Sequence, residues 1–346
     1  MESHAMIYAD QRWIGDHGIG RFARHVLADQ GYCPIPLTGH PAAPLDALRL
    51  TGALRTLSRD DLFFSPGYNS PLSCRSPFAI TIHDLSHIHC PENSSPLIRL
   101  YYATILKSAC RRAARILTVS EFTRAEILDW SGLHADAVCN VGCGVEPSYR
   151  PDGDVTLFPF PYLLCVSNRK RHKNEPRVVA AFAQSGLARR MHLLFTGEAT
   201  PQLARSIEQH HLTTSVGFVG CVPESRLPPL YRGAEALIFP SLYEGFGLPI
   251  LESMACGTPV VTANITAMPE TAGGAALLVD PTSVDEIANA MKRIVTDTSL
   301  RRELRDKGLT RAAKFAWQNT AAHVREILTT RVESSSRNSY LATVRR

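Results

Sequence analysis

Residues 239–261 read FPSLYEGFGLPILESMACGTPVV, and this stretch decides the fold. An apolar run ends at Pro240, a glycine-bearing loop follows, and a helical pattern begins near Pro249 and stops at Gly257. Proline is favoured in the first turn of a helix, and glycine is favoured just beyond its end. The stretch therefore predicts a strand, a glycine loop and a helix in succession.

Two glutamates and two glycines of this stretch are placed to bind a ligand. Glu244 lies in the loop and Glu252 lies one turn inside the helix. Gly245 and Gly247 allow a ligand to approach the backbone closely. The N–H groups and the helix dipole at Gly247 and Leu248 favour an anion. We predict a bound diphosphate there, with the carboxylates taking hydroxyl groups on either side; a capped helix with a solvated Glu252 is the alternative.

The rest of the chain repeats this alternation of strands and helices. Short β-like runs are separated by amphipathic stretches such as Val284–Val295. Such alternation predicts parallel sheets with helices on both faces, and two series of runs predict two doubly wound, Rossmann-like α/β domains. The runs are Met6–Ala9, Cys33–Leu37, Leu62–Ser65, Phe78–His83, Ile116–Ser120, Ala137–Val141, Tyr162–Val166, His192–Thr196, Val216–Val219, Ala236–Pro240, Pro259–Thr262 and Ala275–Val279.

Proline and glycine mark the predicted domain boundary. Residues 147–161 hold four prolines and lack helical periodicity, so we expect one domain over 1–155 and a second over 156–316. Ligands of such sheets bind beyond the carboxyl ends of the strands, which predicts a site in a cleft between two facing domains. Residues 332–346 are rich in Ser and Arg and predict a disordered tail.

Composition limits the class of protein. The 346 residues are 45% apolar and 20% charged, which favours a folded globular chain over a disordered one. The net charge of +5 is too small to favour a nucleic-acid partner. Nine scattered cysteines predict buried free thiols in a reducing cytoplasm. The N-terminus lacks a signal-peptide pattern, and the absence of any apolar run of 18 residues predicts no spanning helix.

A basic segment follows the first strand of the second domain. Residues 166–174 read VSNRKRHKN, and five of them are basic or histidine. A lysine supplies a point charge and an arginine a bidentate donor, so the segment suits a diphosphate. Lys173 and either Arg169 or Arg171 are the candidate cations, with Asn168 beside them; a solvated basic turn is the alternative.

The glycines near the N-terminus fit a second kind of site poorly. Gly18 and Gly20 open a helix with the spacing of the dinucleotide fingerprint, so an NAD-type Rossmann oxidoreductase is an alternative function. That fingerprint needs a tight turn, but residues 11–17 intervene after the strand. It also needs an acidic residue after the second strand, and Cys33–Leu37 offers none.

Histidines crowd the end of a strand in the first domain. Residues 81–89 read TIHDLSHIH, which invites a metal hypothesis. Their spacing matches no zinc template, and no C-x-x-C pair accompanies them, so we predict no metal site.

The stretch 239–261 resembles the E-x7-E signature of glycosyltransferase family 4. The resemblance covers most of residues 160–330, including 216–220, 230–234 and 268–274. It implies a retaining, metal-independent transferase of the GT-B fold without a cofactor. It also implies that Glu244 contacts the donor sugar and Glu252 the ribose. The same resemblance places further donor contacts at Val219, Gly220, Gly245, Phe246, Gly247 and Leu248.

The resemblance gives roles to the other segments as well. Basic residues at Asn168–Lys173 neutralise the leaving diphosphate in that family, although here Ser167 replaces its glycine and Asn168 its arginine. The loop of Gly18 and Gly20 lies against the diphosphate from the other side of the cleft. His83 reaches the donor sugar and the acceptor, and the acceptor side includes Asp84, His87 and Ser120. Ser120 alone equally fits a helix N-cap.

The implied reaction is transfer of a hexosyl, mannose-like unit from a nucleotide-diphosphate sugar to a glycan or lipid-linked acceptor. The first 25 residues and 168–174 resemble bacterial mannosyl- and deoxymannosyl-transferases of surface polysaccharide and lipopolysaccharide assembly, which favours a GDP-linked donor. The closing segment 315–320 implies a helix over 317–331 that crosses back to the first domain. A lipid-diphosphate acceptor implies peripheral contact with the inner membrane face through a basic helix at 97–115. A nucleotide-sugar-binding protein without catalysis is a further alternative.

Overall fold

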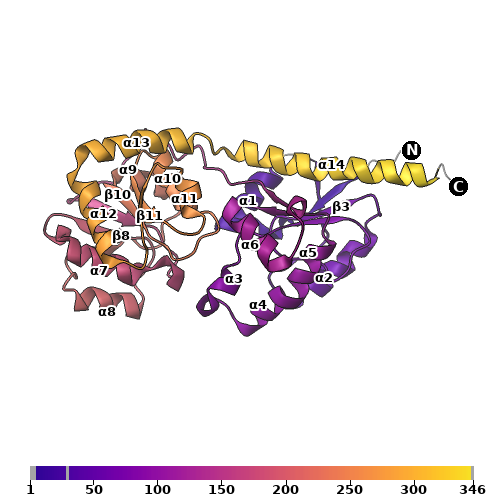
Figure 1. Ribbon diagram of the computed structural model, residues 1–346, viewed down its shortest axis with the longest axis horizontal. Helices are drawn as coiled ribbons and strands as arrows, with labels where there is room; N and C mark the ends of the chain where they lie inside the picture. Colours follow the sequence, from indigo (N-terminus) through magenta and orange to yellow (C-terminus); the bar gives the residue numbers. More distant parts are fainter. Residues whose placement is uncertain (1–4, 29–30, 344–346) are drawn as a thin grey trace. The chain divides into compact units, whose positions relative to one another are not determined.

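The chain forms two compact α/β units, drawn in Figure 1. The computed structural model describes residues 5–28 and 31–343, with side chains for all of these except 93 and 331–343. One unit joins the chain up to Gly144 with the segment from Trp317 onward, and the other runs from Val145 to Ala316. Each has its own hydrophobic core.

The boundary lies earlier in the chain than the proline-rich segment predicted. That segment packs on the second unit, where the Arg232 guanidinium donates to the Asp154 carbonyl at 2.7 Å and the Thr156 N–H to the Pro229 carbonyl at 3.0 Å. The N–H of Val145 donates to the carbonyl of Phe315 at 3.0 Å, so the first residue of this unit is hydrogen-bonded to a residue at its end. Backbone hydrogen bonding, rather than proline content, sets the boundary.

The first unit contains a six-stranded parallel sheet in the order β2-β1-β3-β4-β5-β6. Strands β3 and β4 are buried on both faces, as expected of a sheet covered by helices on both sides. Its strands are β1 (Ile7–Ala9), β2 (Tyr32–Pro34), β3 (Leu62–Ser65), β4 (Phe78–Thr81), β5 (Arg115–Thr118) and β6 (Val138–Asn140).

The second unit repeats this architecture with the order β12-β11-β10-β7-β8-β9, again all parallel. The predicted strands and the doubly wound fold class are confirmed in both units. Its strands are β7 (Tyr162–Cys165), β8 (His192–Phe195), β9 (Val216–Phe218), β10 (Ala236–Phe239), β11 (Val260–Ala263) and β12 (Leu277–Val279).

Helices connect the strands and cover the sheets. In the second unit α7 and α12 pack against each other, and α10 packs on α13. The helices of the first unit are α1 (Gly18–Leu27), α2 (Asp46–Ala53), α3 (Ser86–His89), α4 (Pro96–Tyr101), α5 (Lys107–Arg112), α6 (Glu121–Ser131) and α14 (Trp317–Thr343). Those of the second are α7 (Glu175–Ser185), α8 (Pro201–Gln209), α9 (Leu227–Gly233), α10 (Leu248–Ala255), α11 (Met268–Ala272), α12 (Val284–Thr296) and α13 (Thr298–Ala312).

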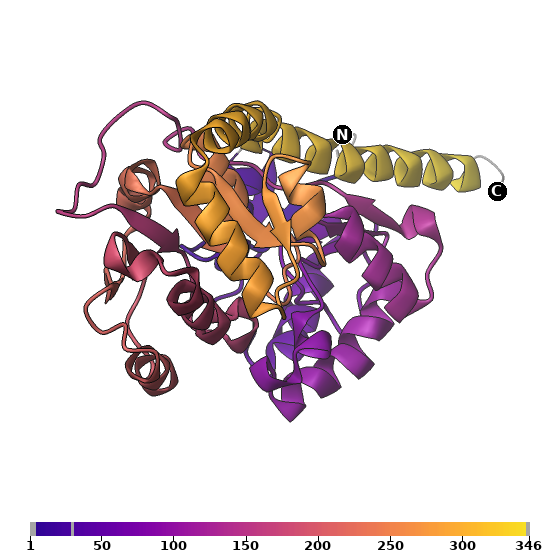
Figure 2. The same ribbon diagram turned by 60° about the vertical axis from the view of Figure 1, so that its left-hand side comes forward.

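Helix α14 belongs to the first unit and packs against α1. The Trp317 indole stacks on the His25 imidazole with ring centroids 4.7 Å apart. Both views draw α14 as one unbroken rod (Figures 1 and 2), and it continues to Thr343 where the sequence predicted a disordered tail from 332. Once a helix is nucleated, each added residue costs little, so a polar segment can extend it. Residues 344–346 lie outside the described part of the chain.

Two expectations drawn from composition have counterparts in the structure. All nine cysteines lie within the described residues and are free thiols, five of them buried. Burial raises the pKa of Cys110 and of Cys256 to about 12, so these thiols stay protonated and unreactive at neutral pH. Over the described ranges, no helix is long and apolar enough to span a bilayer.

Candidate active site

The order of the second sheet creates a switch point between β7 and β10. From β7 the chain moves outward to β8 and β9, and then returns to place β10 on the other side of β7. Ligands of open α/β sheets bind at such a point, beyond the carboxyl ends of the strands. The segments that follow these two strands are the basic segment 166–174 and the loop 240–248, so the topology brings together the two strongest sequence motifs.

Backbone and side-chain contacts join the two segments. The Asn174 amide donates to the Pro240 carbonyl at 3.0 Å, and the Leu242 N–H donates to the His172 carbonyl at 2.7 Å. Lys173 Nζ then lies 2.6 Å from Glu244 Oε1, and 4.9 Å from the centre of the Phe239 ring. Both charged side chains are only about one-eighth exposed, at 12% and 13%. The predicted cation and the predicted sugar-binding carboxylate therefore form one ion pair.

Glu252 is buried, which differs from a solvated position on the helix. The residue is 2% exposed, and its Oε2 accepts a hydrogen bond of 2.9 Å from the hydroxyl of Tyr231. Tyr231 comes from α9, and burial together with the nearby Glu252 raises its pKa well above the usual value. The tyrosine hydroxyl therefore stays a donor and holds the carboxylate in place.

The start of α10 has the geometry that the glycine pattern predicts. Gly247 is its N-cap with φ of 92°, a left-handed conformation that favours glycine. Phe246 is buried, and its carbonyl accepts from the Thr271 hydroxyl at 2.5 Å. The Ser241 hydroxyl of the same loop is buried without a hydrogen-bond partner among the described residues. This orphan polar group at the switch point is a feature that the sequence pattern did not reveal.

Arg169 and Arg171 are not equivalent candidates for the diphosphate. The Arg169 guanidinium pairs with Glu175, donates to the carbonyls of Thr196 and Glu198, and lies over the ring of Phe195. It therefore holds the loop after β7 in place, and its contact with the diphosphate stays a prediction. Arg171 is exposed and lines a pocket of about 610 Å³ beside α7 and α8.

Three other predicted donor contacts lie at the ends of β7 and β9. The Asn168 side chain accepts from the Lys170 N–H at 3.3 Å, and Asn168 is exposed. The Val219 N–H donates to the Phe195 carbonyl at 2.9 Å. The Gly220 carbonyl accepts from the Gly197 N–H at 2.6 Å. These positions share the carboxyl edge of the sheet with the Lys173–Glu244 pair, and their contact with a ligand stays a prediction.

In the first unit, His83 follows β4 and is half-buried. Its Nε2 lies 2.8 Å from the Pro66 carbonyl, which can only accept, so this nitrogen carries the proton. Burial lowers the pKa of His83, and the neutral ring leaves Nδ1 as an acceptor. Asp84 accepts from the Ser86 N–H at 2.9 Å and so shapes the start of α3. His87 packs edge-on against Tyr102, with ring centroids 5.6 Å apart.

In the predicted glycine loop, Gly20 makes contacts within the loop itself. The Gly20 N–H donates to Nδ1 of His17 at 3.1 Å, and its contact with a diphosphate stays a prediction. A Cβ at Gly20 would lie 2.5 Å from the Gly15 carbonyl oxygen, which explains why this residue is glycine. Gly18 is exposed, with open space where a Cβ would stand. Of the two glycines, Gly18 keeps the geometry of a ligand contact.

Ser120 and the histidine cluster have local roles in the structure. The Ser120 hydroxyl accepts from the Thr123 N–H at 3.0 Å and caps α6. His89 pairs with Glu126 at 3.2 Å. Within the described residues, no three His, Cys, Asp or Glu side chains gather as a metal-ligand set.

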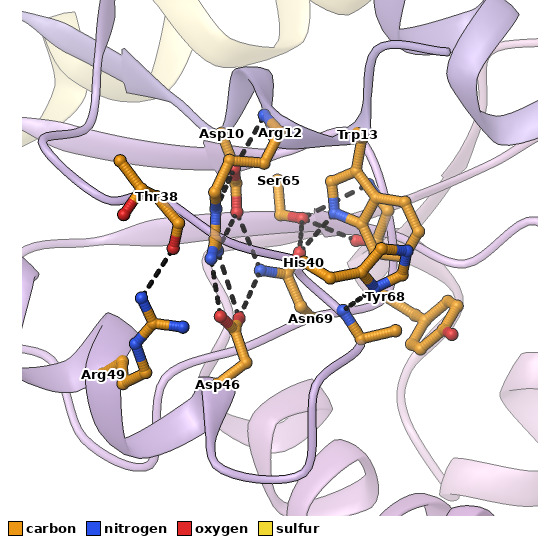
Figure 3. A network of polar contacts seen from close by, with 12 residues as sticks. Asp10, Arg12, Trp13, Thr38, His40, Asp46, Arg49, Ser65, Tyr68 and Asn69 are labelled. Atoms are coloured by element: carbon orange, nitrogen blue, oxygen red, sulfur yellow. Dashed lines mark hydrogen bonds and ion pairs between the residues drawn. The ribbon is translucent and has the colours of Figure 1, made fainter. Parts of the chain in front are cut away.

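A buried polar network fills the switch point of the first sheet, between β1 and β3. Arg12 lies between Asp10 and Asp46, and both of these pairs measure 2.6 Å. The Asn69 amide donates to both carboxylates, at 2.8 and 3.2 Å, and accepts from the Trp13 indole at 2.6 Å (Figure 3). This network, which no sequence motif indicated, joins the segments after β1 and β3 to the start of α2.

Comparisons with known proteins agree with this geometry. The model of glycosyl transferases group 1 matches residues 159–311, and that of glycosyltransferase family 4 matches residues 12–149. The O-antigen chain mannosyltransferase B of Escherichia coli is 30% identical over 275 residues, which are 75% of this chain and 72% of that protein. The chain belongs to glycosyltransferase family 4.

Further relatives extend the family assignment. The serotype-specific mannosyltransferase WbdA of Escherichia coli is 28% identical over 73% of this chain, which spans only 33% of that protein. The solved structure of HepE from Anabaena, in complex with UDP and glucose, aligns with a TM-score of 0.73 and 19% identity over 94% of this chain and 100% of that one. The GT-B fold of family 4 is thus confirmed, and the chain is a glycosyltransferase rather than an oxidoreductase.

Proposed function

We propose that the chain transfers a mannosyl unit, with retention, from a nucleotide-diphosphate sugar to a glycan or lipid-linked glycan in surface polysaccharide assembly. The observation that carries the proposal is the Lys173–Glu244 pair at the β7/β10 switch point, with Glu252 held by Tyr231 on the helix that follows. The mannosyltransferase names of the relatives support the sugar. A GDP-linked donor rests on the resemblance of residues 1–25 and 168–174 to mannosyltransferases.

Breaking the sugar–phosphate bond requires positive charge beside the leaving diphosphate. As the sugar–phosphate bond breaks, its electron pair moves to the diphosphate. The oxygen of an acceptor hydroxyl bonds to the same carbon from the same face, and its proton passes to the leaving diphosphate. Lysine has three N–H donors, so Lys173 can keep Glu244 and still donate to a phosphate oxygen. The N–H groups at Gly247 and Leu248 add the positive end of α10. In this account protein groups stabilise the leaving diphosphate without a metal ion.

The remaining predicted residues receive narrower roles in the proposal. Glu244 takes a donor sugar hydroxyl and orients Lys173. Glu252 takes the ribose hydroxyls, and the Tyr231 hydroxyl positions its carboxylate. Nδ1 of His83 accepts a hydrogen bond from a sugar hydroxyl, because Nε2 donates to the Pro66 carbonyl.

The test is a donor screen with purified full-length chain. GDP-mannose, GDP-fucose, UDP-glucose and UDP-N-acetylglucosamine are offered with mannose oligosaccharides, and products are read by mass spectrometry. We expect a hexose added from GDP-mannose, at a rate that EDTA leaves nearly unchanged. Lys173→Ala should lower the rate by about 10²-fold or more, because one preorganised donor to the leaving group is lost.

Lys170→Ala is the matched control for this test. Lys170 lies in the same basic segment and is exposed, so its removal should leave the rate unchanged. Donor binding without any turnover would favour the non-catalytic alternative. Loss of activity in EDTA with recovery in Mg²⁺ or Mn²⁺ would contradict the metal-free account.

We also propose peripheral membrane contact through residues 96–112. The structure forms these residues as α4, a π-helical turn over Tyr102–Leu106, and α5; Arg115 instead begins β5, which shortens the predicted helix. Leu97 and Leu100 are 71% and 58% exposed, and Arg99 and Arg111 are exposed as well. Each cation near an anionic surface contributes about 1 kcal/mol. Flotation with phosphatidylglycerol vesicles, lost with phosphatidylcholine or at high salt, is the expected result; equal recovery on both lipids would remove this proposal.

A further inference from the structure

The first unit contains a pocket of about 420 Å³ beside its switch point. This size falls in the usual range of ligand pockets, about 300–1,000 Å³. One wall is the loop 41–47 at the start of α2, and the opposite wall is the segment 95–105 of α4 and the π-helical turn. Tyr68 and Asn69, which follow β3, also line it. It therefore lies where the topology of an open sheet places a ligand.

The polar lining of the pocket has a definite charge. Asp46 and Asn69 line it, and both belong to the buried network with Arg12 and Asp10 (Figure 3). Two carboxylates and one guanidinium leave one net negative charge. A phosphate or diphosphate group would meet like charge there, whereas a hydroxyl group can donate to a carboxylate oxygen of Asp46.

Apart from Ser95 and Thr104, the remaining lining is apolar or aromatic. The walls include Ala43, Pro44 and Ile98, and Tyr68 and Tyr101 present ring surfaces. The Tyr101 hydroxyl donates to the Tyr68 carbonyl at 3.1 Å, which fixes one ring against the loop that carries the other. A pyranose has this same combination of surfaces, because its C–H faces are apolar and its rim carries hydroxyl donors. Tyrosine offers an apolar body with a polar tip that suits such a partner.

The pocket is linked to His83 through a single loop. The Pro66 carbonyl holds Nε2 of His83, and Tyr68 and Asn69 follow two and three residues later in the pocket wall. A ligand in the pocket therefore contacts the loop that positions the histidine. This continuity connects the pocket to the reaction instead of to an unrelated function.

We propose that this pocket binds neutral pyranose units of the glycan acceptor. The proposal rests on the proposed function and narrows its acceptor: the sugar portion, and not a lipid diphosphate, occupies the first unit at this point. The net negative lining selects against the charged part of a lipid-linked acceptor, and the tyrosines and apolar walls receive the faces of the sugar.

The test measures glycan binding separately from catalysis. Methyl α-D-mannopyranoside and α-linked mannotriose are titrated into the full-length chain and followed by saturation-transfer NMR. Thr104→Trp and Ala42→Trp each add an indole from an exposed position in one of the two walls, so the core is not disturbed. Ala103→Trp adds the same side chain to the neighbouring exposed position, which does not line the pocket.

We expect Thr104→Trp and Ala42→Trp to weaken mannotriose binding tenfold or more, and to raise the acceptor KM while the donor KM stays constant. Ala103→Trp should match the parent chain in both. No binding of either probe by the parent chain, or equal binding in all three variants, would overturn the pocket assignment. A chain that binds mannotriose through this pocket but transfers no sugar would overturn the proposed function and leave the pocket standing.

Discussion

The two sheets have equivalent switch points that are filled in different ways. Between β1 and β3, Asp10 and Asp46 share the guanidinium of Arg12, and Asn69 joins both carboxylates. Between β7 and β10, Glu244 is held by the flexible side chain of Lys173. The two carboxylates of the first arrangement are 0% and 3% exposed, whereas Glu244 in the second is 13% exposed.

The contrast separates a network that fixes the backbone from a pair that can exchange partners. Arg12 is bound in a fork between two carboxylates, and its pKa is raised because their hydrogen bonds outweigh the effect of burial. Lys173 contributes a point charge that can serve Glu244 and a phosphate together. The comparison predicts that variants at the first switch point lose stability, and that variants at the second lose activity while the fold survives.

The largest expected effect is on stability. Arg12→Leu should lower the free energy of unfolding of the first unit by about 3–5 kcal/mol, because it leaves two buried carboxylates without their cation. The three tryptophans, at 13, 130 and 317, all lie in this unit. Urea unfolding followed by tryptophan fluorescence therefore reports on the first unit alone.

Arg24→Leu is the matched control. It breaks the exposed Arg24–Asp16 pair, whose side chains are 37% and 89% exposed, and such pairs contribute at most about 1 kcal/mol. Equal losses in the two variants would show that the network at β1 and β3 has no special role in stability.

The second effect is on activity. Glu252→Gln keeps the volume of the side chain but removes the charge that binds the ribose hydroxyls. We expect kcat/KM to fall by an amount equivalent to about 2–4 kcal/mol, with the melting temperature nearly unchanged. Glu252→Ala would mix a loss of stability with the loss of activity. It opens a cavity at a 2% exposed position and leaves the Tyr231 hydroxyl without this partner.

Tyr231→Phe sharpens this comparison. It retains the charge of Glu252 and removes the donor that positions it, so kcat/KM should fall less than in Glu252→Gln. If Tyr231→Phe lowered the melting temperature and left the kinetics unchanged, the contact would be structural only.

Sequence pattern predicted the elements well because strand and helix signals are local. The alternation of apolar runs located every strand, and Pro249 and Gly257 located α10. The same local motifs indicated Lys173 and Glu244, which the sheet order then joined across 71 positions of sequence. The pairing of Lys173 with Glu244 could not be predicted without the sheet topology, because no motif indicates which strand lies beside β7.

The parts that sequence did not predict depend on distant partners. Tyr231 and Glu252 are 21 positions apart, and Asp10 and Asn69 are 59 apart. Arg169 fits the basic pattern as well as Lys173 does, but its guanidinium pairs with Glu175 and donates to backbone carbonyls at the end of a neighbouring strand. Burial and the choice of partner are thus properties of the packed sheet edge.

The smallest expected effect is a pH dependence that tests how rigid the first switch point is. Burial lowers the pKa of His83 below the usual value of about 6.5, and the Pro66 carbonyl keeps its proton on Nε2. As the pH falls below 6.5, the unfolded chain takes up a proton that the folded unit does not bind. The stability contributed by neutral His83 is therefore complete above that pH and is lost as the pH falls toward the lower folded pKa. A single group gives a slope of at most about 1.4 kcal/mol per pH unit.

Unfolding of the first unit, followed by tryptophan fluorescence between pH 7.5 and 5.5, should show a smaller slope in His83→Asn than in the parent chain. His17, whose pKa burial also lowers, leaves a residual slope of the same sign. Identical slopes in the two chains would mean that the loop after β3 moves and hydrates His83, which would contradict a rigid first switch point.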